Sequence, residues 1–224
     1  MNSENATTQP NPDAPMPTLG LSQLHKVKLS DQDEAFLKSL APRFAGSPRW
    51  RVHKEKMTRD LLALGQITNR VTYHWFDVTG DFRVLFDLKV TVPCLPDPRG
   101  SLQIAPSATL GLTYREAAMT TPQPGYVFVS IIQPRTVWLA NCARDFGQQL
   151  CLGPKLDAGI SAIELIVISY LALTLQSFQF DERDSAGILH AEAARWWQHN
   201  IKLIPLSNEP FITRTTPTTN TTKP

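Results

Sequence analysis

The sequence predicts an α+β fold in which helices pack on one side of a four-stranded antiparallel meander. Apolar residues recur at helical spacing from 48 to 64, at every second position through four segments between 70 and 132, and at helical spacing again after 158. A run of strands between helical segments is typical of an α+β domain. The 224 residues are enough for one such domain with extended ends.

The two ends of the chain differ in composition from its middle. Residues 1–20 and 213–224 are rich in Pro, Asn and Thr and poor in large apolar side chains, so both are expected to be disordered. Residues 21–47 are expected to form a short helical extension, residues 48–204 the domain itself, and residues 205–224 a C-terminal segment.

The extension contains one clear helix signal, SDQDEAFLKSLAPRF (30–44). Ser30 is a typical N-cap, Asp33 stands at the third helical position, and apolar side chains follow at helical spacing as far as Leu40. This helix is expected to end near Pro42, because proline breaks the hydrogen-bonding pattern of a helix.

The first helix of the domain is predicted over RWRVHKEKMTRDLLALG (49–65). Pro48 suits the first turn of a helix, and Gly65 suits its end. One stripe of the helix is apolar. A basic cluster is expected on its outer face, formed by Arg51, Lys54, Lys56 and Arg59.

The meander is predicted from segments rich in Val, Phe, Tyr and Trp. RVTYHWFDV (70–78) and FRVLFDLKVTV (82–92) flank the turn Thr79-Gly80-Asp81 and are expected to form a hairpin. SATLGLTYR (107–115) and GYVFVSII (125–132) continue the pattern. Two prolines in the connection between them exclude regular pairing there.

Two helices are predicted after the strands. The run AGISAIELIVISYLALTL (158–175) has nearly the length of a membrane span. Glu164, several hydroxyl side chains and the lack of basic anchors on its C-terminal side favour a buried helix of a soluble core. The last helix is expected to begin at a cap formed by Asp184 or Ser185, with Trp197 among its apolar positions.

The composition argues against several classes of function. A net charge of +2 and a pI near 8.5 are too mild for a nucleic-acid-binding domain. Three cysteines form no disulfide framework, and the N-terminal residues lack the apolar run of a signal peptide, so reduced thiols and a cytoplasmic protein are expected. The sequence has no CxxC or HxxxH pair, which argues against a metal site.

QQLCLGPKL (148–156) contains the most informative thiol. Cys151 stands between two leucines, and Gly153-Pro154 follows at once, a pair that turns the backbone and is expected to leave the sulfur exposed. Cys142 is the rival nucleophile, but its neighbours lead into charged residues. Cys94 stands at a strand end and is expected to be structural.

A thiol at such a turn suits two kinds of chemistry. A cysteine peptidase needs a histidine to take the thiol proton and a third group to orient the ring, but none of the five histidines lies in a recognisable local motif. A cysteine that receives an acyl group from an activated thioester and passes it to an amine needs no such base.

The element order and the segments around Cys151 resemble the ubiquitin-conjugating (E2) fold family over residues 48–200. That family has an N-terminal helix, a four-stranded meander, an irregular stretch ending in the active cysteine, and C-terminal helices. LGLTYREAAMTTPQPGYVFVS is similar to two of its strands and their proline-containing connection. The other matching segments are GYVFVSIIQP, LCLGPKL, the helix from 160, the acidic turn DERD and the small-residue opening SAGILHAEAA.

The resemblance implies an E2-type acyltransferase. Cys151 would accept a ubiquitin-like protein as a thioester from an E1-like enzyme and pass it to an amine on a protein substrate. ATP would be used by the E1-like partner, and no cofactor of this chain, nucleic acid or membrane is implied. The family's His-Pro-Asn is missing, as it is in bacterial E2-like proteins of antiphage operons, so a bacterial protein of that type is expected.

The resemblance also implies roles for other residues. Asn141 is a candidate for the asparagine that steadies the oxyanion, the alternative being that no side chain does so. Asp181 is a candidate to orient the substrate lysine, whereas Asp184 is equally an ordinary helix cap. The basic cluster Arg51, Lys54, Lys56 and Arg59 matches the family surface that meets the activating enzyme.

Two alternatives to this function stay open. The missing His-Pro-Asn also fits a catalytically inactive E2-fold module that serves as a binding scaffold. A cysteine peptidase is the second alternative, and it would depend on one of the histidines.

Overall fold

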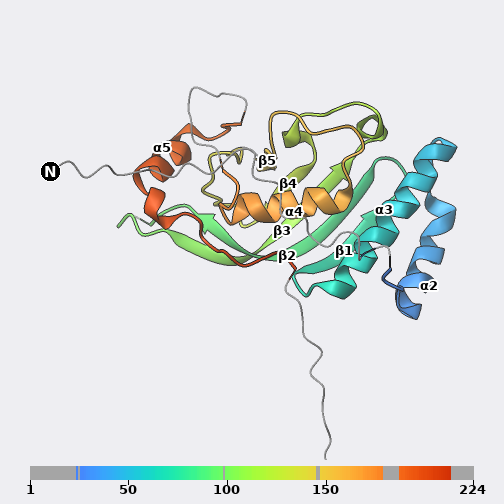
Figure 1. Ribbon diagram of the computed structural model, residues 1–224. Helices are drawn as coiled ribbons and strands as arrows, with labels where there is room; N and C mark the ends of the chain where they lie inside the picture. Colours follow the sequence, from blue (N-terminus) through green and yellow to red (C-terminus); the bar gives the residue numbers. More distant parts are fainter. Residues whose placement is uncertain (1–23, 25, 98, 145–146, 179–186, 213–224) are drawn as a thin grey trace, which may run out of the picture.

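Within the described residues, namely 24, 26–97, 99–144, 147–178 and 187–212, five strands form one antiparallel sheet in the computed structural model (Figure 1). Their order is that of the chain, so the sheet is a meander. The ends predicted to be disordered, 1–20 and 213–224, lie outside these residues. The strands are β1 (Val71–Asp77), β2 (Phe82–Cys94), β3 (Gln103–Tyr114), β4 (Val129–Gln133) and β5 (Gln149–Leu150).

The α+β prediction is confirmed, but the predicted four-stranded meander is one strand short. In β5, Leu150 pairs with Val129 and Gln149 with Ser130 of β4. A strand of only two residues is too short to show the alternation of apolar and polar residues that marks a strand, so the sequence pattern does not reveal β5. β4 also starts later than predicted, because Gly125–Val127 form a 3₁₀ turn instead of strand.

Most of the buried apolar residues of the strands lie on one side of the sheet. Every second side chain of β2 from 82 to 88 is buried, and Phe86 lies opposite Leu110 of β3. α4 (Ala162–Leu173) crosses the sheet (Figure 1), with Leu165 fully buried. Burial of one such side chain stabilises the fold by about 1.5–3 kcal/mol, so this interface forms the centre of the core.

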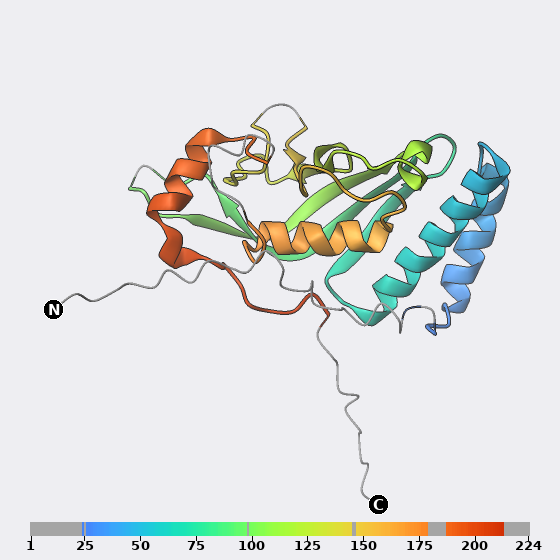
Figure 2. The same ribbon diagram turned by 45° about the horizontal axis from the view of Figure 1, so that its top comes forward.

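Two helices, α2 (Asp31–Leu40) and α3 (Pro48–Ile67), lie side by side next to β1 (Figures 1 and 2). Ser30 caps α2 as predicted, because its Oγ accepts a hydrogen bond from Asp33 N at 3.1 Å. α3 begins at Pro48 as predicted, but Gly65 does not end it. A glycine inside a helix costs only about 1 kcal/mol, which the packing of the helix offsets.

The helix predicted over 158–175 is α4, and Glu164 is part of its N-terminal cap. Ser161 Oγ accepts from Glu164 N at 3.1 Å, and Ser161 N donates to Glu164 Oε2 at 2.7 Å. This reciprocal pair is a capping box. In the described part of the chain, no helix has the length and apolar character needed to cross a bilayer.

α5 (Ala191–His199) begins later than predicted. It starts after His190, whereas the predicted caps, Asp184 and Ser185, lie outside the described residues. Trp197 of α5 is fully buried, and its Nε1 donates to Trp138 O at 2.7 Å. This bond ties α5 to the loop between β4 and β5.

Candidate functional site

The candidate site lies at the end of a long loop that leaves β4 and returns as β5. Residues 136–138 first cross to the far end of β2, where Leu95 N donates to Thr136 O at 2.7 Å and Trp138 N donates to Pro93 O at 2.8 Å. The chain then turns back, so that residues 141–143 run antiparallel to residues 149–151. The loop is therefore held by backbone pairing at both of its arms.

Cys151 and Asn141 lie opposite each other in this pairing. Cys151 N donates to Asn141 O at 2.8 Å, and Asn141 Nδ2 donates to Cys151 O at 2.9 Å. The two candidate residues are ten positions apart in sequence, and the loop brings them into direct contact. One N–H of the Asn141 amide therefore steadies the backbone of the cysteine, which leaves its second N–H for another acceptor.

The sulfur of Cys151 is not exposed, so that expectation is wrong. The residue is only 3% exposed, and its Sγ lies 3.4 Å from Gly153 O, to which it donates. The turn at Gly125 packs directly on this segment, with Gly125 N donating to Gly153 O at 3.0 Å. A Cβ at Gly125 would lie 2.6 Å from Gly153 N, so only glycine allows this close approach.

Burial also sets the protonation of the thiols. It raises the pKa of Cys151, which keeps the thiol neutral near pH 7. Cys142 is more deeply enclosed, pairs with Leu150 on the adjoining strand, and has a pKa raised by burial to about 12. Cys94 is buried as well. Of the two candidate nucleophiles, Cys151 is the one that has an asparagine side chain on its own carbonyl.

Gln148 is a residue of the site that sequence reasoning missed. Gln148 is buried, and its side-chain Nε2 donates to Ile131 O at 3.1 Å and to Pro134 O at 2.8 Å. Its backbone carbonyl accepts a hydrogen bond from Ile131 N. Its φ of +32° is unusual for a residue other than glycine. The signal in the sequence was a polar residue directly after Gly147 and close to the apolar Leu150. This signal does not predict the partners of Gln148, because Ile131 and Pro134 lie in a distant segment of the chain.

Lys54 does not belong to the predicted basic face. It is fully buried, and its Nζ donates to Val78 O and, at 3.1 Å, to Gly80 O. The ammonium also lies 5.3 Å from the centre of the Trp50 ring. Lys54 sits one helical turn from both Trp50 and Met57, so it shares their buried stripe rather than the outer face.

The other three residues of the predicted basic face are exposed on α3. Lys56 Nζ lies 2.6 Å from Asp60 Oδ2, and Arg59 Nη1 lies 2.7 Å from Glu34 Oε1 of α2. Arg51 is exposed as well. Because two of these cations are already paired with carboxylates, the net positive charge of this face is smaller than the sequence suggests.

The remaining predicted site residue, Asp181, lies outside the described residues. The four described histidines have contacts with groups other than Cys151. His53 stacks on Trp50, and His74 Nε2 lies 2.9 Å from Asp87 Oδ2. The His190 ring packs edge-on against Trp138, and His199 Nδ1 lies 2.7 Å from Arg195 O.

The described residues contain no group of three or more His, Cys, Asp or Glu side chains that could hold a metal ion. Comparisons of this chain with family models, with curated proteins and with solved structures find no match.

Proposed function

We propose that this chain is an E2-like acyltransferase that carries a ubiquitin-like protein as a thioester on Cys151. The observation that carries the proposal is the reciprocal bonding of Asn141 and Cys151, which places an amide side chain beside the backbone of a cysteine at the end of β5. The helix α3 before the meander and α4 after the cysteine add support, since they follow the element order of the family that the sequence resembles.

The chemistry needs two acyl transfers. In the first, the Cys151 thiol gives up its proton and the thiolate attacks the thioester carbonyl held by an E1-like enzyme. A new carbon–sulfur bond forms, the bond to the sulfur of that enzyme breaks, and the departing thiolate takes up a proton. In the second, a neutral amine of the substrate attacks the Cys151 thioester, the amide forms, Cys151 leaves as a thiolate and the amine loses its proton. The E1-like partner consumes the ATP, and Asp181 orients the incoming amine.

The enclosed sulfur sets a condition on this function. Cys151 is buried, and the turn at Gly125 packs on Leu152 and Gly153, the two residues directly after it. We infer that docking of the E1-like partner moves this turn away from Leu152 and Gly153. Arg51, Lys56 and Arg59 on α3 are the exposed cations proposed for that docking. The setting that we propose is the bacterial cytoplasm, as part of antiphage conjugation, on the ground of the missing His-Pro-Asn.

The same burial favours a second candidate function, a binding module that has lost the chemistry. A cysteine that is 3% exposed, with a pKa raised by burial, is a poor nucleophile as it stands. A cysteine peptidase is less well supported than either, because the described histidines are engaged with Trp50, Asp87, Trp138 and Arg195.

A mixing experiment tests the proposal. The protein is incubated with an E1-like enzyme, a ubiquitin-like protein and ATP from the same genome, and run on a gel without reductant. We expect an adduct that reductant removes, that Cys151→Ala abolishes and that Cys142→Ala retains. Asn141→Ala should lower the rate of transfer to lysine by about 100-fold, as loss of an oxyanion donor does.

Controls separate the candidates. The binding module predicts a stable complex with the same partners and no adduct in the wild-type chain. A peptidase predicts hydrolysis of the ubiquitin-like precursor without ATP. An adduct that persists in Cys151→Ala would disprove the assignment of the nucleophile.

A further inference from the structure

Residues 204–212, the last residues that the structure describes, are docked on the domain although they form no helix or strand. Figure 2 shows them leaving α5 and passing alongside α4 toward β1. Leu206 N donates to Thr174 O at 2.9 Å, and Phe211 is only 2% exposed. We call residues 204–212 the strap.

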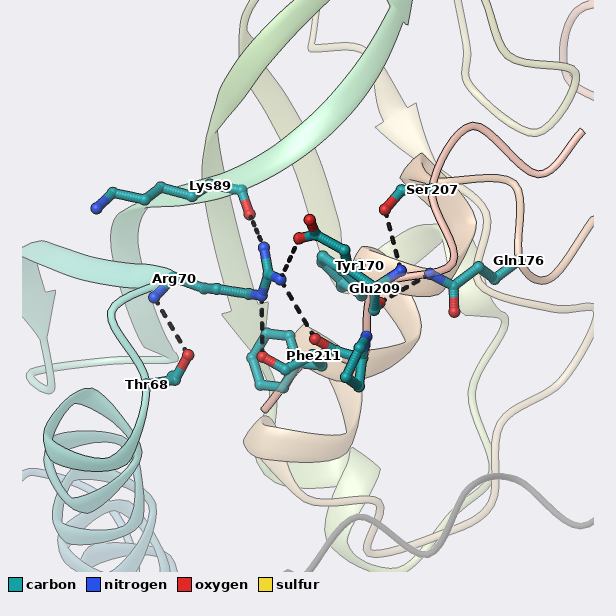
Figure 3. Close-up of polar contacts among 9 residues, drawn as sticks. Thr68, Arg70, Lys89, Tyr170, Gln176, Ser207, Glu209 and Phe211 are labelled. Carbon is teal, nitrogen blue, oxygen red and sulfur yellow. Dashed lines mark hydrogen bonds and ion pairs between the residues drawn. The ribbon is translucent and has the colours of Figure 1, made fainter. Parts of the chain in front are cut away.

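Arg70 holds the end of the strap with three contacts (Figure 3). Its Nε donates to Phe211 O at 3.1 Å, and its Nη2 lies 2.7 Å from Glu209 Oε2 and 3.3 Å from Pro210 O. The guanidinium is itself held in place, because Nη1 donates to Lys89 O and the group lies 5.1 Å from the centre of the Tyr170 ring. A fixed guanidinium fork of this kind recognises oxygens in a defined geometry.

Two further side chains bind the same stretch of the strap: Tyr170 of α4, and Gln176, which follows α4 in the chain. Tyr170 Oη donates to Glu209 O at 2.8 Å, and Gln176 Nε2 donates to the same carbonyl at 3.1 Å. The ring of Phe211 packs edge-on against Tyr170, with 5.4 Å between ring centres. Arg70 thus binds the carboxylate and two backbone carbonyls of the strap, and Tyr170 binds a third carbonyl and the aromatic ring.

We propose that Arg70, Tyr170, Thr174 and Gln176 form a recognition site for extended peptides of the type acidic–Pro–aromatic, filled in this chain by its own strap. We call it the Arg70 site. Its contacts are side-chain donors aimed at backbone carbonyls, the Thr174 carbonyl that accepts from Leu206 N, an aromatic ring packed on Tyr170 and one charge pair. Backbone hydrogen bonds combined with side-chain contacts are the way proteins recognise extended peptides. The site goes beyond the proposed acyl transfer and does not depend on it.

The test uses the full chain carrying Glu209→Ala and Phe211→Ala, which weakens the strap and leaves the site intact. A fluorescent peptide of residues 204–212, IPLSNEPFI, is titrated and its anisotropy measured. We expect saturable binding to this variant and at least about 10-fold weaker binding to the wild-type chain, because a tethered strap competes at an effective concentration of about 1 mM. Circular dichroism confirms that the variant is folded.

Matched controls report on the proposed contacts. A peptide with both residues changed to alanine should not bind, and adding Arg70→Ala to the variant should weaken binding at least about 10-fold, as expected for loss of a charge-assisted fork. Arg83→Ala, an exposed arginine on β2, should leave binding unchanged. Failure of the peptide to bind the folded variant, or equal binding of the alanine peptide, would overturn the proposal.

Hydrogen exchange on the wild-type chain covers the case in which the variant does not fold. The Leu206 amide, bonded to Thr174 O, should exchange by local release of the strap, at least about 100-fold faster than the amides of α4. Arg70→Lys should accelerate it further. Exchange of Leu206 at the rate of the core would show that the strap is an inseparable part of the fold and would end the proposal.

Discussion

Two side chains in this protein have properties that follow from burial rather than from residue type. Lys54 is fully buried and bonded to the carbonyls of the β1–β2 turn, and Cys151 is enclosed although a turn follows it. Lysine is almost never fully buried without hydrogen-bonding partners, so its contacts should be costly to remove.

Lys54→Met tests the structural role of this ammonium. The change keeps the length of the side chain and removes the ammonium bonds to Val78 O and Gly80 O. These carbonyls then keep only the longer bonds from Ala45 N at 3.4 Å and Trp50 Nε1 at 3.3 Å, so the free energy of unfolding should fall by about 2 kcal/mol. Lys56→Met is the control, because Lys56 is exposed and forms an i,i+4 pair with Asp60; its effect should stay within about 0.5 kcal/mol. Urea denaturation followed by circular dichroism measures both, and equal effects would contradict the placement of Lys54.

Alkylation by iodoacetamide tests the burial of Cys151. In the folded chain the neutral, enclosed thiol should react at least about 10-fold more slowly than in the unfolded chain, since the thiolate is the reactive form. Mass spectrometry of the labelled peptides separates Cys151 from Cys142 and Cys94. Rapid labelling of Cys151 in the native protein would show that the sulfur is already open to solvent.

At the scale of elements, the turn at Gly125 and the segment after β5 depend on each other. Gly125 lies so close to Leu152 and Gly153 that no side chain fits between them. The 3₁₀ turn before β4 therefore positions the backbone next to the candidate nucleophile, although 26 positions separate Gly125 from Cys151 in the sequence.

Gly125→Ala should displace this backbone. Its Cβ would lie 2.9 Å from Leu152 N, so the turn and the cysteine segment must move apart, and alkylation of Cys151 should become at least about 10-fold faster. Gly80→Ala is the matched control, because a Cβ there would meet nothing within 4 Å. Iodoacetamide labelling of Cys151 compares the two variants. Unchanged labelling in Gly125→Ala would contradict the idea that the turn at Gly125 helps to enclose the thiol.

At the scale of the whole molecule, several buried groups must remain uncharged for the chain to stay folded. Burial raises the pKa of Tyr114 to about 12 and that of Cys142 to about 12. It also raises the pKa of Tyr73, Tyr170 and Cys151. Burial lowers the pKa of Lys54, and this shift alone would make the fold more stable as the pH rises. The five groups with raised pKa values have the opposite effect on stability and outnumber it.

Stability should therefore decrease in alkaline solution. A group whose pKa is raised on folding contributes fully below its unfolded pKa, 9.0 for cysteine and 10.0 for tyrosine, and the contribution is lost as the pH rises toward 12. Unfolding free energies measured from pH 8 to 11 should fall, with about 3 kcal/mol lost by pH 11 through Cys142 and about 1 kcal/mol through Tyr114. Tyr114→Phe should make the decrease shallower, and a flat profile in the wild-type chain would contradict the burial of these groups.

Much of the fold was predictable because its signals are local. Ser30, Pro48 and the apolar periods specify where α2, α3 and the first strands begin, and these patterns depend on residues within a few positions of one another. β5 was missed, because a strand of two residues exists only through its pairing with β4.

The candidate site divides in the same way. The position of Cys151 before a turn and a helix follows from the sequence, whereas Asn141 was a candidate only through the family resemblance, and its role stays a prediction. The structure places the Asn141 side chain in contact with the Cys151 carbonyl. The exposure of the sulfur was predicted wrongly, because this segment packs against residues from a distant part of the chain, such as Gly125 against Leu152 and Gly153. Gln148 was overlooked for the same reason.

Residue order alone thus specifies the helices, the hairpin and the identity of the candidate thiol, since caps, turns and periodicity act between near neighbours. Tertiary structure decides which polar groups are buried and what they bind. Examples are the carbonyls bonded to Lys54, the burial of Cys151, and the hydrogen bonds between Arg70 and the strap. Those properties arise only when segments far apart in the chain pack together and exclude water from between them.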